Sequence, residues 1–128
     1  MSDQTQAPVY GPYSPIRQTG DLYFISGQVG LDPQTKTAQS NAQQQTAQVL
    51  TNLAGVLAEE HLTLNDIIKT TIYLTDMADF AAVNAEYLKH FATPRPARAT
   101  IGVQELPRLG GDVPLLVEIE AIAARGTA

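Results

Sequence analysis

The feature that most constrains this chain is an alternating stretch near its end, VEIEAIAA at Val117–Ala124. Successive side chains of a β-strand point to opposite faces, so the stretch predicts a strand with one wholly apolar face. The other face carries Glu118 and Glu120 and then Ile122. Burying an unpaired carboxylate costs about several kcal/mol. The second face must therefore meet water, a cationic partner, another subunit or a ligand.

Length and composition predict a single domain that spans residues 1–128. A chain of 128 residues is long enough to bury one ordinary core. Hydrophobic residues make up 44% and charged residues 16%, which excludes disorder over most of the chain. Residues 1–8 are polar and are expected to form a loose tail.

Charge and cysteine content exclude several classes of function. The net charge is −5 and the eight Lys and Arg residues are scattered, so the sequence predicts no nucleic-acid partner. The absence of cysteine excludes disulfides, thiol nucleophiles and cysteine-ligated zinc. The N-terminus lacks the pattern of a signal peptide, and no apolar run has the length of a membrane span. We therefore expect a soluble, cytoplasmic protein without a membrane partner.

Five strands and two helices are expected from the hydrophobic pattern, in the order β-β-α-β-α-β-β. The predicted strands cover residues 13–18, 22–28, 67–74, 97–103 and 113–124. Ser40 and Gln43 have the spacing of a capping box, which predicts a helix from there to Glu60. Asp76 can cap a second helix. The apolar stripe of that helix is Phe80, Val83, Asn84, Tyr87, Leu88 and Phe91.

Two helices suffice to cover only one face of such a sheet. Assembly of several subunits would cover the other face. Arg98, Thr100, Glu118 and Glu120 would then lie at a subunit boundary. On geometry alone this assembly is one of several ways to satisfy that face.

A few polar side chains are candidates for chemistry, each with a structural alternative. The planar fork of Arg98 suits a carboxylate, which is either Glu118 or Glu120 across the sheet or the carboxylate of a substrate. Tyr13 and Ser26 are either ordinary strand-end residues or hydroxyl donors at a site.

The remaining candidates are an amide and two histidines. Asn84, in a helical stripe, either fixes a neighbouring loop, which is the reading we favour, or borders a ligand. His61 is expected to cap the end of a helix and His90 to lie on the surface. The two histidines lack metal-ligand spacing, so no metal site is expected.

Five stretches of the chain together resemble the RidA/YjgF family of imine and enamine deaminases. They are GPYSP (residues 11–15), YFISGQVGLDPQT (23–35), IIKTTIYLTDMADFAAVNAEY (67–87), PARAT (96–100) and VEIEAIA (117–123). The resemblance implies an α+β, chorismate-mutase-like fold, in which a mixed sheet carries two helices on one face. It also implies a homotrimer with clefts between the subunits.

The resemblance further implies a function. This is hydrolysis of the 2-imino acids and enamines that pyridoxal-phosphate enzymes release, giving 2-oxo acids and ammonia. The activity would be that of a 2-iminobutanoate/2-iminopropanoate deaminase. No cofactor is expected, because a protonated imine is already electrophilic and water needs only orientation and a mild base.

Transferred position by position, the resemblance makes Arg98 the binder of the substrate carboxylate and Glu118 the holder of the hydrolytic water. Tyr13 contributes a catalytic hydroxyl. Ser26, Gly27, Asn84 and Thr100 are assigned to substrate binding.

Two features depart from the family pattern. Thr100 stands where many members have cysteine, so thiol chemistry cannot apply here. The loop over residues 105–114 is longer than in the archetype, and if it borders the cleft it changes the size of substrate admitted. Two other functions therefore stay open: a non-catalytic module that binds a small metabolite or a protein, and a hydrolase or lyase of another small molecule.

Overall fold

The computed structural model describes residues 8–109 and 111–126. Most of the predicted tail, together with Gly110, Thr127 and Ala128, lies outside these residues. All five predicted strands are present, although the first and last begin three and four residues later than the pattern suggested. They are β1 (Ile16–Thr19), β2 (Leu22–Val29), β3 (Ile67–Leu74), β4 (Ala97–Gly102) and β5 (Val117–Ala124).

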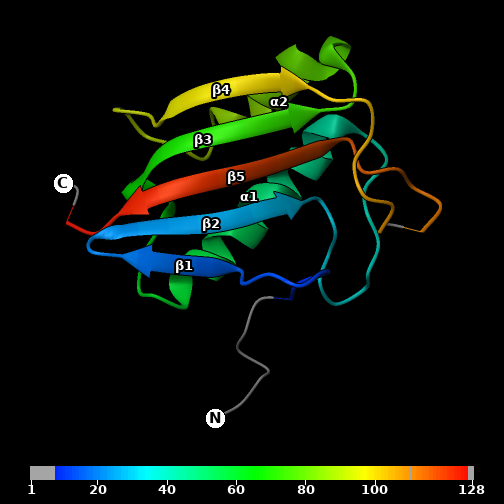
Figure 1. The fold of residues 1–128 in the computed structure, drawn as a ribbon. Helices are drawn as coiled ribbons and strands as arrows, with labels where there is room; N and C mark the ends of the chain where they lie inside the picture. The colour runs from blue at the N-terminus through cyan, green and yellow to red at the C-terminus, as the bar shows by residue number, and fades with distance from the viewer. Residues whose placement is uncertain (1–7, 110, 127–128) are drawn as a thin grey trace.

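The strands form one mixed sheet in the order β1-β2-β5-β3-β4 (Figure 1). The alternating strand β5 lies in its centre and pairs antiparallel with both β2 and β3. The only parallel pair is β3 with β4, among the strands that the structure describes. A parallel pair needs a crossover, and here the connection contains the second helix.

Both α-helices, α1 (Ala42–Ala58) and α2 (Phe80–Tyr87), lie on one face of the sheet, which Figure 1 shows behind the strands. Two short 3₁₀ turns precede β3 and α2, at Leu64–Asp66 and Met77–Asp79. The apolar face of β5 packs in the core, where Val117, Ile119 and Ala123 are fully buried. The α+β fold with two helices on one sheet face is confirmed.

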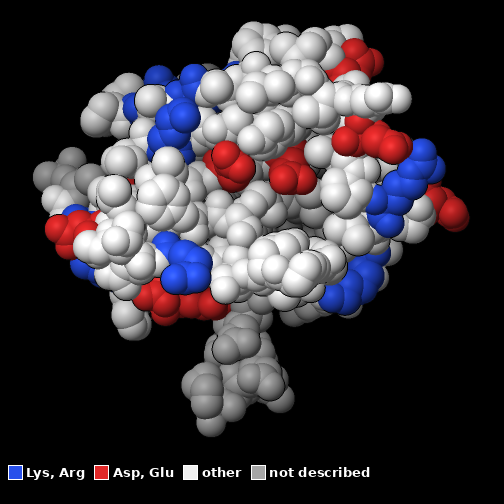
Figure 2. All heavy atoms as spheres, in the orientation of Figure 1, with Lys and Arg blue, Asp and Glu red and all other residues white. Residues whose placement is uncertain are grey.

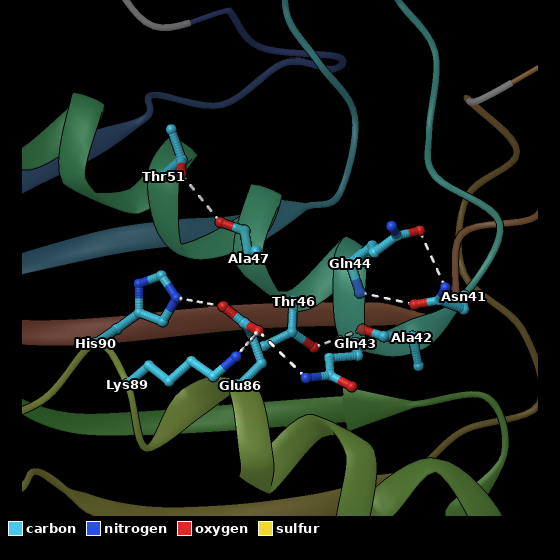
Figure 3. Close-up of polar contacts among 10 residues, drawn as sticks. All are labelled: Asn41, Ala42, Gln43, Gln44, Thr46, Ala47, Thr51, Glu86, Lys89 and His90. Carbon is cyan, nitrogen blue, oxygen red and sulfur yellow. Dashed lines mark hydrogen bonds and ion pairs between the residues drawn. The ribbon is translucent and has the colours of Figure 1, made fainter.

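Helix α1 begins one residue later than the capping box predicted. Asn41, not Ser40, is the N-cap: its backbone is extended and its Oδ1 accepts a hydrogen bond of 2.8 Å from the Gln44 amide (Figure 3). Serine and asparagine are both favoured at this position, so their order in the sequence could not decide between them. The helix ends at Ala58, two residues before the predicted end.

The second helix is shorter and less regular than predicted. Asp76 does act as a cap, but of the 3₁₀ turn, through the Ala78 amide at 2.9 Å. Within the predicted apolar stripe, Phe80 and Leu88 are 41% and 57% exposed. The predicted stripe therefore packs only partly in the core, and Phe80 and Leu88 lie outside it.

His90, expected on the surface, is partly buried and contacts Glu86, the residue of α2 that links the two helices. Its Nε2 lies 2.8 Å from Glu86 Oε2, and Gln43 of α1 donates to the other carboxylate oxygen at 3.5 Å (Figure 3). The hydrogen bond with His90 lowers the pKa of Glu86, against the effect of burial. His61 follows α1 with a left-handed backbone at φ 60°, and its amide donates to Ala58, as expected for a helix cap.

A fully buried amide fixes the entry to β5. Gln45 of α1 donates to the carbonyls of Gln39 and Pro114 at 2.8 and 2.9 Å, and its Oε1 accepts from the Leu116 amide at 2.7 Å. The three bonds satisfy the amide and tie the chain before β5 to α1. None of the helices described has the length and apolarity needed to cross a membrane.

Candidate active site in two halves

Glu118 lies on the outer face of the sheet, opposite the helices. It pairs across the sheet with Val29 of β2 and Tyr73 of β3. The β2 strand is irregular between Ile25 and Gln28. Gly27 lies in this irregularity, and a Cβ placed there would stand 2.1 Å from Glu118 Oε2. Gly27 therefore makes room for the carboxylate, as only glycine can.

A cavity of about 870 Å³ opens beside this carboxylate. Both acidic residues of β5 line it, and Figure 2 shows acidic atoms gathered in a hollow over the middle of the sheet. The predicted site residues that line the cavity are Tyr13, Ser26, Gly27 and Glu118. Pro107 and Leu109 also line it, so the long loop does border the cleft. None of the described residues lining it is Lys or Arg.

The surroundings of Glu118 make its carboxyl a weaker acid than that of a solvated glutamate. Partial burial raises the pKa of the Glu118 carboxyl, and the negative charge of Glu120 on the same strand face raises it further. Within the described chain no residue donates a hydrogen bond to the side-chain carboxylate of Glu118. Such a carboxylate is a stronger base than a solvated one.

The two hydroxyl residues border the cleft in different ways. Ser26 Oγ donates to the Ser14 carbonyl at 2.6 Å, and its backbone amide donates to Pro15 at 3.0 Å. These bonds hold the N-terminal segment against β2 and commit the Ser26 proton. Tyr13 is 47% exposed, and its hydroxyl contacts the Tyr10 amide at 3.4 Å. Tyr13 is therefore free to approach a ligand or a second subunit.

Arg98 lies on the opposite, helix-covered face of the sheet, on β4. Its partner across the sheet is the buried Thr70 of β3. Nε donates to Thr100 Oγ1 at 2.9 Å, and Nη2 donates to Asn84 Oδ1. Three of the predicted site residues thus meet at one point, and Asn84 holds Arg98 rather than a loop.

Two aromatic rings of α2 complete the surroundings of Arg98. The guanidinium carbon lies 4.9 Å from the ring centre of Tyr87 and 5.5 Å from that of Phe80. Tyr87 is fixed in turn by a 2.8 Å hydrogen bond to Thr70. The rings hold the plane of the guanidinium by cation–π contact.

The structural alternative for Arg98, a pairing with Glu118 or Glu120 across the sheet, is wrong within one chain. Strand β3 separates β4 from β5, and the side chains point to opposite faces of the sheet. The parallel crossover places β4 at the edge of the sheet, beside β3 and not beside β5.

Sequence reasoning also missed Tyr73, Phe80 and Tyr87 as neighbours of the candidate residues. A signal existed for the two on α2: Phe80, Asn84 and Tyr87 are spaced i, i+4, i+7 and therefore share one helix face. We interpreted that face as part of the core. Tyr73 has no local signal, because its proximity to the acidic pair depends on the β3–β5 register.

Metal chemistry has no cluster to support it in the described part of the chain. No group of three or more His, Cys, Asp or Glu side chains there is arranged to hold an ion.

The fold and the two clusters define a class of small α+β proteins, and comparison identifies it. The family described as Endoribonuclease L-PSP matches residues 4–125. The structure of RidA from an Antarctic Psychrobacter superposes with a TM-score of 0.86 at 32% identity, covering 96% of each chain. This chain belongs to the RidA/YjgF family, which includes reactive intermediate deaminases.

Particular relatives are similar over most of the chain. Reactive Intermediate Deaminase A of the Arabidopsis thaliana chloroplast is 39% identical over 96% of this chain and 64% of its own length. The RutC family protein PH0854 of Pyrococcus horikoshii is 44% identical over 88% of this chain and 86% of its own. The structure of E. coli TdcF with bound serine has a TM-score of 0.85 at 34% identity, covering 98% and 97% of the two chains.

Proposed function

We propose that this protein hydrolyses 2-imino acids and their enamine tautomers, released by pyridoxal-phosphate enzymes, to 2-oxo acids and ammonia. The observation that carries the proposal is a fixed guanidinium with unused N–H groups, in a chain that also holds a basic carboxylate beside an open cleft. The first suits the substrate carboxylate and the second suits a water molecule. A named deaminase among the relatives supports the same chemistry.

The reaction follows from these two groups. Arg98 binds the carboxylate, which places C2 of the iminium at a defined point. Glu118 takes a proton from water as the water oxygen attacks C2, giving a carbinolamine. The proton then passes from Glu118 to the nitrogen. As the C–N bond breaks, Glu118 takes the proton of the carbinolamine hydroxyl, so that ammonia leaves and the 2-oxo acid is the second product.

The opposite faces on which Arg98 and Glu118 lie require a second chain. Arg98 sits on β4, which in the described residues pairs only with β3 and so forms an edge of the sheet. The outer face also exposes Leu22, Phe24 and Ile101 at 38–45%. A homotrimer would cover these side chains and bring Arg98 of one subunit to Glu118 of the next.

Assembly is tested by sedimentation equilibrium. We expect a trimer at micromolar concentration. A monomer under those conditions would remove the model of a site shared between subunits.

The family description names an endoribonuclease, and the cleft does not favour that activity here. Glu118 and Glu120 line it, and they repel a phosphate backbone. The bound serine in TdcF shares its carboxylate and its C2 nitrogen with a 2-imino acid, which supports an amino-acid-sized ligand. A cytoplasmic location remains our expectation, although one relative is mitochondrial and another chloroplastic.

A coupled assay tests the activity. A pyridoxal-phosphate dehydratase or an amino-acid oxidase generates the imine, and semicarbazide traps what remains. We expect this protein to lower the yield of semicarbazone and raise the rate of 2-oxo acid release. Unchanged trapping would leave a non-catalytic binding module as the better interpretation. Parallel incubation with RNA tests for nuclease activity.

A further inference from the structure

The hydrogen bonds of Arg98 are arranged so that one edge of its guanidinium is closed. A guanidinium binds a carboxylate with two parallel bonds along one of two edges, either Nε with Nη2 or Nη1 with Nη2. Thr100 Oγ1 accepts the single Nε–H at 2.9 Å. Asn84 takes one hydrogen of Nη2 and leaves the other.

The plane of the guanidinium is fixed as well. The Phe80 and Tyr87 rings lie 5.5 and 4.9 Å from its central carbon, and Tyr87 is anchored on the buried Thr70. With the plane fixed and Nε occupied, two parallel bonds can form only along the edge of Nη1 and Nη2. That edge determines the direction in which the rest of a bound carboxylic acid extends.

We propose that Thr100 is a positioning residue that selects the Nη1–Nη2 edge of Arg98 for the substrate carboxylate. The inference rests on the proposed function only for the identity of that carboxylate. Thr100 then acts through Arg98 instead of touching the substrate.

The chemistry of the side chain explains why a hydroxyl serves here. An oxygen accepts strongly from a charged N–H, a thiol sulfur accepts weakly, and a methyl group does not accept at all. Without an acceptor, Nε–H is free to compete for the substrate carboxylate. The carboxylate then divides its hydrogen bonds between Nε–H and the Nη1–Nη2 edge, and only the orientation set by that edge directs C2 at the base.

Thr100→Val removes the acceptor while keeping the shape, and Thr100→Ser restores it. In Thr100→Val we expect kcat to fall on the order of ten- to a hundredfold, as misplacement of a reacting atom does. The affinity for 2-oxobutanoate, a product analogue, stays within about twofold, because a bidentate site remains. Thr100→Ser should recover both values. Wild-type kcat in Thr100→Val, or equal loss in Thr100→Ser, would overturn the assignment.

A second measurement does not depend on turnover. In ¹⁵N spectra of the arginine side chains, 2-oxobutanoate should shift the Arg98 Nη signals of the wild type and leave Nε–H unchanged. In Thr100→Val it should shift Nε–H as well. If this pattern appears in a wild type without deaminase activity, the proposed function fails and the role of Thr100 stands. If an active wild type shows the Nε–H shift, or if 2-oxobutanoate does not bind, the role of Thr100 fails.

Discussion

The two halves of the candidate site differ in how far one chain completes them. The surroundings of Arg98 are largely built within one chain: two side chains accept hydrogen bonds from it and two rings hold its plane. Glu118 lies in an open cleft, with another carboxylate beside it and no donor among the described residues. The chain thus fixes the group that orients a ligand and leaves the group that performs chemistry unsatisfied.

The two halves therefore serve different roles: Arg98 orients the ligand and Glu118 reacts. An arginine that is already held in place gives the ligand one orientation at little further entropic cost. A carboxylate without donors is reactive for the same reason that it is costly to the fold, since nothing stabilises its charge. Removing either half should therefore have a different consequence, which the following variants test.

The largest effect is expected at Arg98. Arg98→Ala should lose nearly all imine hydrolysis while the assembly persists, because the remaining contacts cannot orient a carboxylate. Arg98→Lys should also lower the rate of imine hydrolysis, because the point charge of lysine cannot reproduce the planar fork of arginine. Initial rates with sedimentation of each variant provide the measurement. Substantial activity in Arg98→Ala would mean that another group binds the substrate.

Glu118→Gln should depress kcat by roughly 10²–10⁴-fold, the usual contribution of a general base. The variant keeps the shape of the side chain, so 2-oxobutanoate should still bind. Calorimetry for binding and the semicarbazide assay for turnover separate the two effects.

Glu120→Gln is the matched control, with the same substitution on the same strand face. Its loss of turnover should be small, and removal of its charge should lower the Glu118 pKa and move the acid limb of the rate profile to lower pH. Full activity in Glu118→Gln, or equal loss in both variants, would show that the carboxylate or the chemistry is wrongly assigned.

A smaller effect is expected at Asn84, through Arg98. Asn84→Ala leaves an Arg98 N–H without its acceptor, which should reduce activity and cost about 1–3 kcal/mol of stability. Asn84→Asp keeps the acceptor but adds a charge that competes with the substrate, so it should reduce activity without that loss of stability. Melting temperatures and KM values of both variants distinguish the loss of the acceptor from the effect of the added charge. Unchanged melting and kinetics in Asn84→Ala would show that the amide has no role.

The smallest effect is on stability, in the Glu118 half. Because the folded-state pKa of Glu118 is raised, the folded protein binds this proton more tightly than the unfolded chain does. The resulting penalty is absent below the ordinary carboxyl pKa and complete above the raised one. Glu118→Gln should therefore melt slightly higher than the wild type at neutral pH, and the difference should shrink in acid. A lower melting temperature at neutral pH would contradict this account of the carboxylate.

Local pattern was sufficient to predict the elements of the sheet but not their neighbours. The bounds of β3 follow from its content of Ile and Thr, and the buried and outer faces of β5 follow from alternation. Both signals depend on neighbouring residues alone. The position of β4 at the edge, and therefore the separation of Arg98 from Glu118, depends on a crossover between distant segments. No periodic pattern in the sequence predicts the order of the strands in the sheet.

The candidate residues show the same limit. Seven residues were assigned by resemblance, and the structure gathers them into two clusters, with Arg98, Asn84 and Thr100 in one. The other contains Tyr13, Ser26, Gly27 and Glu118. The contacts that hold each cluster come from long-range pairing, as between Tyr87 and Thr70. These contacts could not be predicted from spacing.

The buried amide of Gln45 makes the position of β5 independent of the length of the loop before it. Its bonds to Pro114 and Leu116 clamp the chain just ahead of the strand, whereas Pro107 and Leu109 lie upstream of the clamp in the wall of the cavity. Insertions or deletions upstream therefore reshape that wall without shifting the register that places Glu118. The chain can diversify the ligands it accepts by varying the length of one segment while the reactive carboxylate stays in place.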